Sequence, residues 1–172
     1  MPLYQMLDRE LLKAFWKDFK LVTQEEDSNF PIVNPQDAIR ALVKCRNWVG
    51  TFTEMLISNN SLRAIVLKNF KHERYLLNQI EQYWYAELLG EGHPVSALKT
   101  KELAQALITK KTQDDTAYHS IQLNILSLEN ELEELTNDKE TLDLLLKKLE
   151  KTTDWLRDYL NWTKFELRVL QN

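Results

Sequence analysis

Apolar residues recur every three or four positions along most of the chain, which is the spacing of one face of an α-helix. This pattern predicts a first helix over residues 4–22. A second pattern starts at Pro35, where Asn34 can cap a helix and proline suits the first helical position. The polar run 58–61 interrupts it, because short polar side chains compete for backbone hydrogen bonds. We therefore expect a helix to end there and a third helix to follow over 62–89.

Two stretches rich in turn residues separate these helices from the rest of the chain. Residues 23–35 read as a loop, and residues 90–94 contain Gly-Glu-Gly-His-Pro, the sharpest break in the sequence. A short helix is expected over 96–110, followed by a capping signal at 114–116. The predicted organisation is a helical unit over 1–90, a hinge with a short helix over 91–115, and a long helix over 116–172.

The longest pattern in the chain runs from Tyr118 to Leu160 and alternates spacings of three and four without a slip. Its regularity predicts one unbroken helix of coiled-coil type, roughly 65 Å long over these positions. The polar Lys139 and Thr153 also fall on this seam, where such residues set register. Earlier helices, another copy of the chain, or both must cover the seam, and we expect homo-oligomerisation. The apolar positions proposed for it are Ile121, Ile125, Leu128, Leu132, Leu135, Leu142, Leu146, Leu149, Leu156 and Leu160.

Composition agrees with an all-α fold. Among 172 residues there are only 3 Gly and 4 Pro, too few for the many turns of an all-β protein. The single cysteine, Cys45, cannot form an internal disulfide, and a reducing, cytoplasmic location is the natural interpretation. We expect Cys45 to be a buried apolar residue. No signal peptide and no membrane-spanning run is visible, so no membrane partner is expected.

The sequence contains no recognisable catalytic motif. The glycines do not form a phosphate-binding loop, and the three histidines are scattered without metal-ligand spacing. Paired glutamates such as Glu129 and Glu133 lack the Glu-x-x-His elements of a di-metal bundle. We therefore expect a protein that is not an enzyme and that uses neither a metal nor a cofactor.

Basic and aromatic residues alternate in the third predicted helix, and these can hold single-stranded nucleic acid through phosphate contacts and base stacking. The alternative is an ordinary amphipathic helix whose aromatic residues belong to the core. The net charge is −4, and a carboxylate row at 129–134 repels phosphate, so nucleic acid could bind only elsewhere. The candidate binding residues are Lys68, Lys71, His72, Arg74 and Tyr75.

The C-terminal part of the chain combines an apolar-basic pair of turns with a row of aromatic residues: Leu146, Lys147, Lys148, Leu149, Trp155, Leu156, Tyr159, Leu160, Trp162, Thr163, Lys164 and Phe165. In these residues it resembles phage recombination mediators of the UvsY type. That family ends on Leu-Lys-x-Ile, an aromatic residue about one turn on, and Ile-x-Trp-x-Lys-Phe. The resemblance implies a ring-like homo-oligomer that helps a recombinase displace single-strand-binding protein. The family's basic pair would fall near Asn78 and Ile80, which are not basic, so Lys68, Lys71 and Arg74 could only be substitutes.

Two functions therefore stay open. The first is a helical adaptor or assembly protein that forms homo-oligomers through a coiled coil, binds protein partners and single-stranded DNA, and loads a recombinase. The second is a structural or scaffolding coiled-coil component of a phage or multi-protein complex, without nucleic-acid contact. Salt-dependent binding of single strands separates the two.

Overall fold

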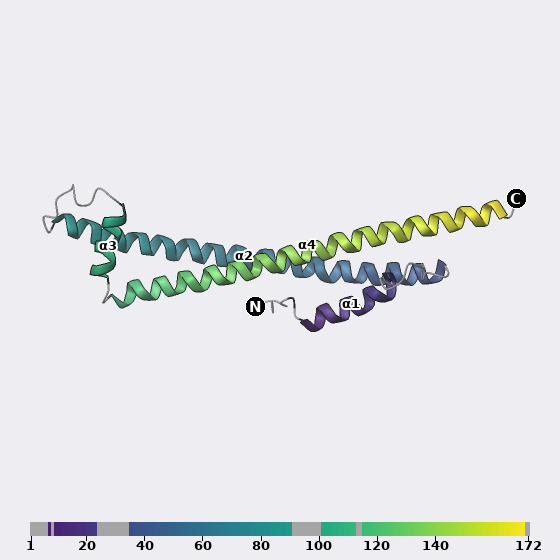
Figure 1. Ribbon diagram of the computed structural model, residues 1–172, viewed down its shortest axis with the longest axis horizontal. Coiled ribbons are helices and arrows are strands. Elements are labelled where there is room, and N and C mark those ends of the chain that lie inside the picture. The colour runs from purple at the N-terminus through teal and green to yellow at the C-terminus, as the bar shows by residue number, and fades with distance from the viewer. Residues whose placement is uncertain (1–6, 8, 24–34, 91–100, 113–114, 171–172) are drawn as a thin grey trace. The chain divides into compact units, whose positions relative to one another are not determined.

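The computed structural model describes residues 7, 9–23, 35–90, 101–112 and 115–170 (Figure 1). They form four α-helices: α1 (Arg9–Thr23), α2 (Pro35–Gly90), α3 (Lys101–Lys111) and α4 (Thr116–Leu170). No strand occurs in this described part of the chain, and the all-α prediction is confirmed. The loop expected over 23–35, the hinge after Gly90 and the first residues of the expected short helix lie outside the described residues, apart from their end positions.

Helix α2 continues through residues 58–61, so the predicted break there is wrong. Asn59 is fully buried, and its Nδ2 donates a hydrogen bond to the carbonyl oxygen of Leu135 at 3.0 Å. The Ser61 hydroxyl donates to the carbonyl oxygen of Ile57, one turn earlier, at 3.0 Å. The Asn59 amide nitrogen and the Ser61 hydroxyl thus donate hydrogen bonds within a continuing helix, where the prediction assumed that such side chains would end it.

Helix α4 is unbroken over the whole seam, as predicted. Asp115 precedes its first residue and acts as the N-cap, since its Oδ1 accepts hydrogen bonds from the backbone N–H of Ala117 (2.9 Å) and Tyr118 (3.2 Å). The capping signal seen in the sequence is thus confirmed at Asp115.

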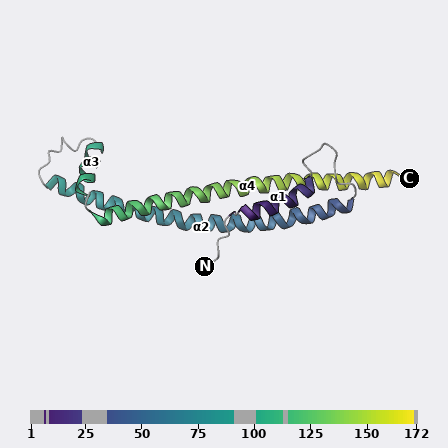
Figure 2. The same ribbon diagram turned by 60° about the horizontal axis from the view of Figure 1, so that its bottom comes forward.

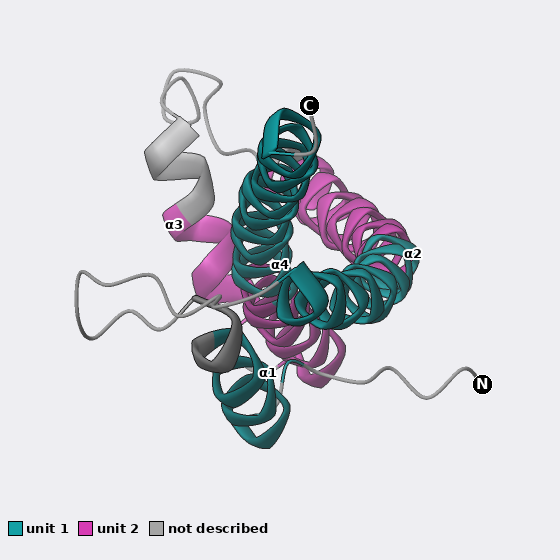
Figure 3. Ribbon diagram, turned by 90° about the vertical axis from the view of Figure 1, so that its right-hand side faces the viewer, with its two compact units in different colours: residues 1–62, 135–172 teal, residues 63–134 magenta. Residues whose placement is uncertain are grey.

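The chain divides into two compact units that cut across the segments expected from the sequence (Figure 3). Unit 1 consists of residues 1–62 and 135–172, and unit 2 consists of residues 63–134. The long helices α2 and α4 each contribute one part to unit 1 and another part to unit 2. The physical reason is that both helices are long enough to pack against different neighbours at their two ends.

Unit 1 is a bundle of α1, the first part of α2 and the second part of α4, with α1 lying along the other two (Figure 2). Phe15 of α1 is fully buried, and its ring lies 5.4 Å from that of Trp48 and 5.1 Å from that of Phe52, both on α2. Leu149 and Leu156 of α4 are fully buried in the same core. Cys45 belongs to this core too, as expected, and burial raises the pKa of its thiol.

Polar contacts fix α1 at the edge of this core. Asp18 accepts hydrogen bonds from Lys44 Nζ at 2.8 Å and from Trp48 Nε1 at 3.2 Å, and the bond from Lys44 lowers the pKa of this carboxyl. The ammonium group of Lys148 on α4 lies 4.7 Å from the ring centre of Trp16. Helix α1 therefore contacts both α2 and α4 through cation-mediated interactions as well as through apolar packing.

In unit 2 the second part of α2 runs antiparallel to the first part of α4, and α3 belongs to the same unit. Arg74 pairs with Glu129 at 2.9 Å, and the Tyr118 hydroxyl donates to Glu81 at 3.3 Å. Burial and the negative charge of Glu81 raise the pKa of Tyr118. At the end of α3, the buried Thr112 donates its hydroxyl to the carbonyl oxygen of Ile108 at 2.9 Å.

Gly50 lies in the interior of α2, and a Cβ atom added there would meet nothing within 4 Å. Glycine in a helix interior costs about 0.5–1 kcal/mol relative to alanine, because its unfolded backbone is freer. We expect Gly50→Ala to raise the free energy of unfolding by that amount and the melting temperature by about 2 °C. Scanning calorimetry on the two proteins measures the difference. A lower melting temperature would contradict the open surroundings of Gly50.

Candidate functional site

Four of the five proposed nucleic-acid-binding residues share one outward face of α2. Lys68, Lys71, His72 and Tyr75 fall at helical spacings i, i+3, i+4 and i+7, and all four are exposed. Further along the same face lie Gln79, whose Nε2 donates to the Tyr75 hydroxyl oxygen at 2.6 Å, and the exposed Tyr83. We call these residues, Lys68, Lys71, His72, Tyr75, Gln79 and Tyr83, the basic-aromatic strip.

The strip carries no carboxylate. The other positions of α2 that share this face are small, polar or apolar, and the nearest acidic residues, Glu73 and Glu81, lie on other sides of the helix. Glu81 is occupied by its hydrogen bond with Tyr118. Among the described residues, neither Lys68 nor Lys71 makes an ion pair, so both can attract a phosphate backbone. The remaining residues of this face are Ser61, Ala64, Ile65, Gln82 and Ala86.

Arg74, the fifth proposed residue, does not join the strip. Its guanidinium pairs with Glu129 of α4 at 2.9 Å and lies 5.3 Å from the ring centre of Phe70. Both charged groups are about half exposed, and such a surface pair contributes no more than about 1 kcal/mol to stability. In this structure Arg74 therefore links α2 to α4. Adjacent helical residues point in different directions, so Arg74 faces α4 while the neighbouring Tyr75 lies on the strip; the partner Glu129 is far away in the sequence and could not be predicted from it.

The aromatic residues of this part of α2 divide between core and surface. Phe70 and Trp84 are half-buried, as the amphipathic-helix alternative expected. Tyr75 and Tyr83 are 57% and 59% exposed, and such open rings can stack on unpaired bases. Beside Tyr83 a hollow of about 410 Å³ opens between α2 and the start of α4, lined mainly by apolar side chains. The sequence prediction missed this hollow, whose lining includes Leu76, Ile80, Trp84 and Ile121.

The seam of α4, proposed for oligomerisation, is covered within the single chain. Leu142, Leu149 and Leu156 belong to the core of unit 1 that also contains Phe15 and Phe52. Of the coverings left open by the sequence, the structure thus shows the chain's own helices. Among the ten positions, Ile125, Leu135, Leu142, Leu149 and Leu156 are buried, and Ile121, Leu128, Leu132, Leu146 and Leu160 are half-buried. Of the polar seam residues, Lys139 pairs with Asp143 at 3.3 Å, and Thr153 is a hydrogen-bond partner of the Cys45 thiol.

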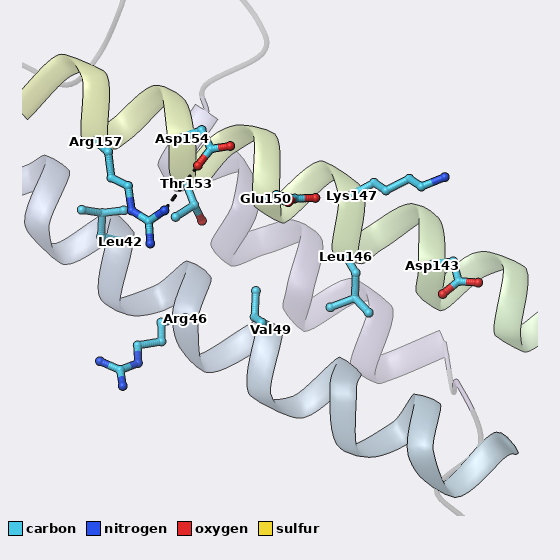
Figure 4. Close-up of a pocket in the computed structure, with 10 residues that line it drawn as sticks. All are labelled: Leu42, Arg46, Val49, Asp143, Leu146, Lys147, Glu150, Thr153, Asp154 and Arg157. Carbon is cyan, nitrogen blue, oxygen red and sulfur yellow. Dashed lines mark hydrogen bonds and ion pairs between the residues drawn. The ribbon is translucent and has the colours of Figure 1, made fainter. Parts of the chain in front are cut away.

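Unit 1 also contains an open groove of about 910 Å³ between α2 and α4 (Figure 4). Its apolar lining comes from Leu42 and Val49 on α2 and from Leu146 on α4. Charged side chains of both signs line its edges, and one pair among them, Arg157 and Asp154, is joined at 3.3 Å. The charged lining residues are Arg46, Asp143, Lys147, Glu150, Asp154 and Arg157.

The last turns of α4 expose a second apolar surface. It includes residues of the C-terminal pattern on which the UvsY-type resemblance depends. Exposed large apolar side chains there are Trp162, Phe165, Leu167, Val169 and Leu170. A concentration of this kind marks a contact surface more often than isolated exposed apolar residues do.

Within the described residues, no group of three or more His, Cys, Asp or Glu side chains is placed to hold a metal ion. None of the described helices combines the length and the apolar character needed to cross a bilayer. No protein-family model, no curated protein and no solved structure matches this chain. The site geometry is therefore the basis for a functional proposal.

Proposed function

We propose that this protein is a non-enzymatic helical adaptor that binds single-stranded nucleic acid along the basic-aromatic strip. The observation that carries the proposal is the strip itself, an exposed face of α2 with Lys68, Lys71 and His72 beside open tyrosine rings and without a carboxylate. The lysines attract phosphates, and the rings of Tyr75 and Tyr83 offer stacking surfaces to bases.

Single strands suit this face better than a duplex does. Base stacking on an aromatic ring needs an unpaired base, since the faces of paired bases are already stacked in a helix. The strip runs along one helix, and Lys68 and Tyr83 are separated by roughly 22 Å at the rise of an α-helix. A short single strand can follow such a line. Because the attraction of lysines for phosphates is electrostatic, we expect binding to be sensitive to salt.

The adaptor role has a second part, self-association, and the resemblance to UvsY-type mediators adds a biological setting for both parts. In that setting, an assembly of this protein holds single-stranded DNA and loads a recombinase onto it. Support for the setting comes from the C-terminal sequence pattern, and support for strand binding comes from the strip.

We expect the double variant Lys68→Ala, Lys71→Ala to bind single-stranded oligonucleotides at least about tenfold more weakly at low salt, because two phosphate contacts are lost. The logarithmic dependence of affinity on salt should become shallower by roughly 1.4, at about 0.7 for each phosphate contact on a single strand. Fluorescence anisotropy with a labelled oligonucleotide of mixed sequence, over a series of salt concentrations, measures both quantities.

The matched control is Lys110→Ala, Lys111→Ala, which removes the same charge from exposed lysines at the end of α3. We expect this control to keep the salt dependence of the unmodified protein. Equal losses in the two double variants would show that net charge, and not the strip, determines binding. Undetectable binding by the unmodified protein at low salt would refute the proposal.

The exposed apolar end of α4 favours a second candidate function, a scaffolding component that makes protein contacts only. Trp162 and Phe165 are large, exposed side chains close to the end of α4, and neither belongs to the core of unit 1. A protein that assembles in solution and shows no affinity for single strands at low salt would support this second function over the first.

A further inference from the structure

Helices α2 and α4 pack side by side in unit 1, and this pair of helices has two sides. Helix α1 occupies one side, where Asp18 contacts Lys44 of α2 and Trp16 contacts Lys148 of α4. The groove of about 910 Å³ is lined by other residues of the same two helices, among them Leu42, Val49 and Leu146 (Figure 4). A bundle of this kind is completed when a further helical element covers such an apolar groove.

The apolar surface continues beyond the groove on the exposed side of α2. Ile39 is 52% exposed and lies two turns before Arg46, and Val43 is 55% exposed and lies about one turn before Arg46. Together with the half-buried floor of the groove, these side chains are apolar surface that would lose contact with water against a partner.

The charged residues at the two edges of the groove favour a second copy of the chain as its partner. Arg46 is the charged residue on the α2 side, and Glu150 lies on the α4 side of the same groove. Neither makes an ion pair within the described residues, whereas Asp143 and Asp154 are paired with Lys139 and Arg157. The α4 edge also carries Lys147, one turn before Glu150, which makes no ion pair within the described residues either. Arg46 on one edge and Glu150 on the other are complementary to their own copies after a half-turn.

We propose that this groove binds the same groove of a second copy of the chain. The two copies are related by a twofold axis parallel to the groove, so α2 of one copy lies on α4 of the other, antiparallel to it. This operation keeps each residue at its own level along the groove, and Arg46 then faces the partner's Glu150 on both edges. Leu42, Val49 and Leu146 from the two copies form the new core of a four-helix arrangement.

The inference deepens the self-association part of the proposed function and rests on that part. It is independent of the basic-aromatic strip, which lies in unit 2, while all residues that line the groove lie in unit 1. Strand binding and groove pairing can therefore be tested separately, on the same preparations of the full-length protein.

The test uses charge reversal at the two edges, measured by sedimentation equilibrium. We expect the unmodified protein to form dimers, and Arg46→Glu and Glu150→Lys each to weaken self-association at least about tenfold, because like charges then face each other. An equimolar mixture of the two variants should restore association, since each interface in the mixed dimer again joins opposite charges. Restoration in the mixture needs contact between chains and cannot arise from repair inside one chain.

The matched control is Lys151→Glu, a charge reversal at the exposed residue beside Glu150 that does not line the groove. It should associate like the unmodified protein, and circular dichroism should show equal helix content in all variants. If the unmodified protein dimerises but neither edge variant is weakened, or if the mixture fails to restore association, the groove pairing is wrong while self-association stands. A concentration-independent monomer would overturn both.

Discussion

Replacing Leu149 by aspartate is expected to destabilise this protein more than any other single change considered. Leu149 has no exposed surface and lies in the core of unit 1 with Phe15 and Phe52. The substitution removes apolar packing and places a carboxyl group where no water reaches it, which together cost more than about 4 kcal/mol. Urea titration followed by circular dichroism should show a transition at much lower denaturant, or a chain that is largely unfolded without urea.

Leu144→Asp is the matched control for this prediction. Leu144 lies on the same helix, and 66% of its surface is exposed. The same change of side chain there should alter the free energy of unfolding by less than about 0.5 kcal/mol. Similar effects at the two positions would mean that the buried side of α4 is not the one described.

The second large effect is expected at Phe15, the only residue of α1 with no exposed surface among those described. Its ring contacts those of Trp16, Phe19, Trp48 and Phe52 at centroid distances of 5.0 to 5.4 Å. Truncation of such a phenylalanine to alanine costs about 3–5 kcal/mol, since it removes a large apolar surface and leaves a cavity. We expect α1 to detach from the bundle, with a change in tryptophan fluorescence at lower denaturant than is needed to unfold the helices as a whole.

Phe165→Ala serves as the control, because Phe165 is 64% exposed near the end of α4. Its truncation should leave the unfolding transition within about 0.5 kcal/mol of the unmodified protein. A loss at Phe165 comparable to that at Phe15 would indicate that a partner or another part of the chain covers the end of α4 in solution.

Local signals in the sequence predicted most of the helices correctly. The cap at Asp115 is a signal within a few residues, and the structure shows its carboxylate bonded to the backbone N–H groups of Ala117 and Tyr118. The prediction of a helix break at Asn59 was wrong because the contact that buries this residue is not local in the sequence. Its amide donates to the carbonyl oxygen of Leu135, which is distant in sequence, so no local pattern could show that this polar residue would be buried inside a helix.

The candidate strand-binding face was partly predictable for the same reason. Helical spacing alone placed Lys68, Lys71, His72 and Tyr75 on one face, and the structure shows them exposed together. The position of Arg74 depended on Glu129, which only the folding of α4 against α2 brings near. The groove of unit 1 is likewise formed by residues of two helices that are far apart in the sequence, so no local sequence motif could predict it.

By itself the sequence determined that this protein is made of helices, where α4 begins, and which of its side chains must leave water. Those properties follow from spacing and from caps, which act over a few residues. Only the tertiary structure decided what covers the apolar seam, because a row of leucines fits the helices of its own chain and those of another copy equally well. In this protein α1 and α2 cover it in unit 1, and the surfaces that we propose for contacts with partners are the groove, the strip and the end of α4.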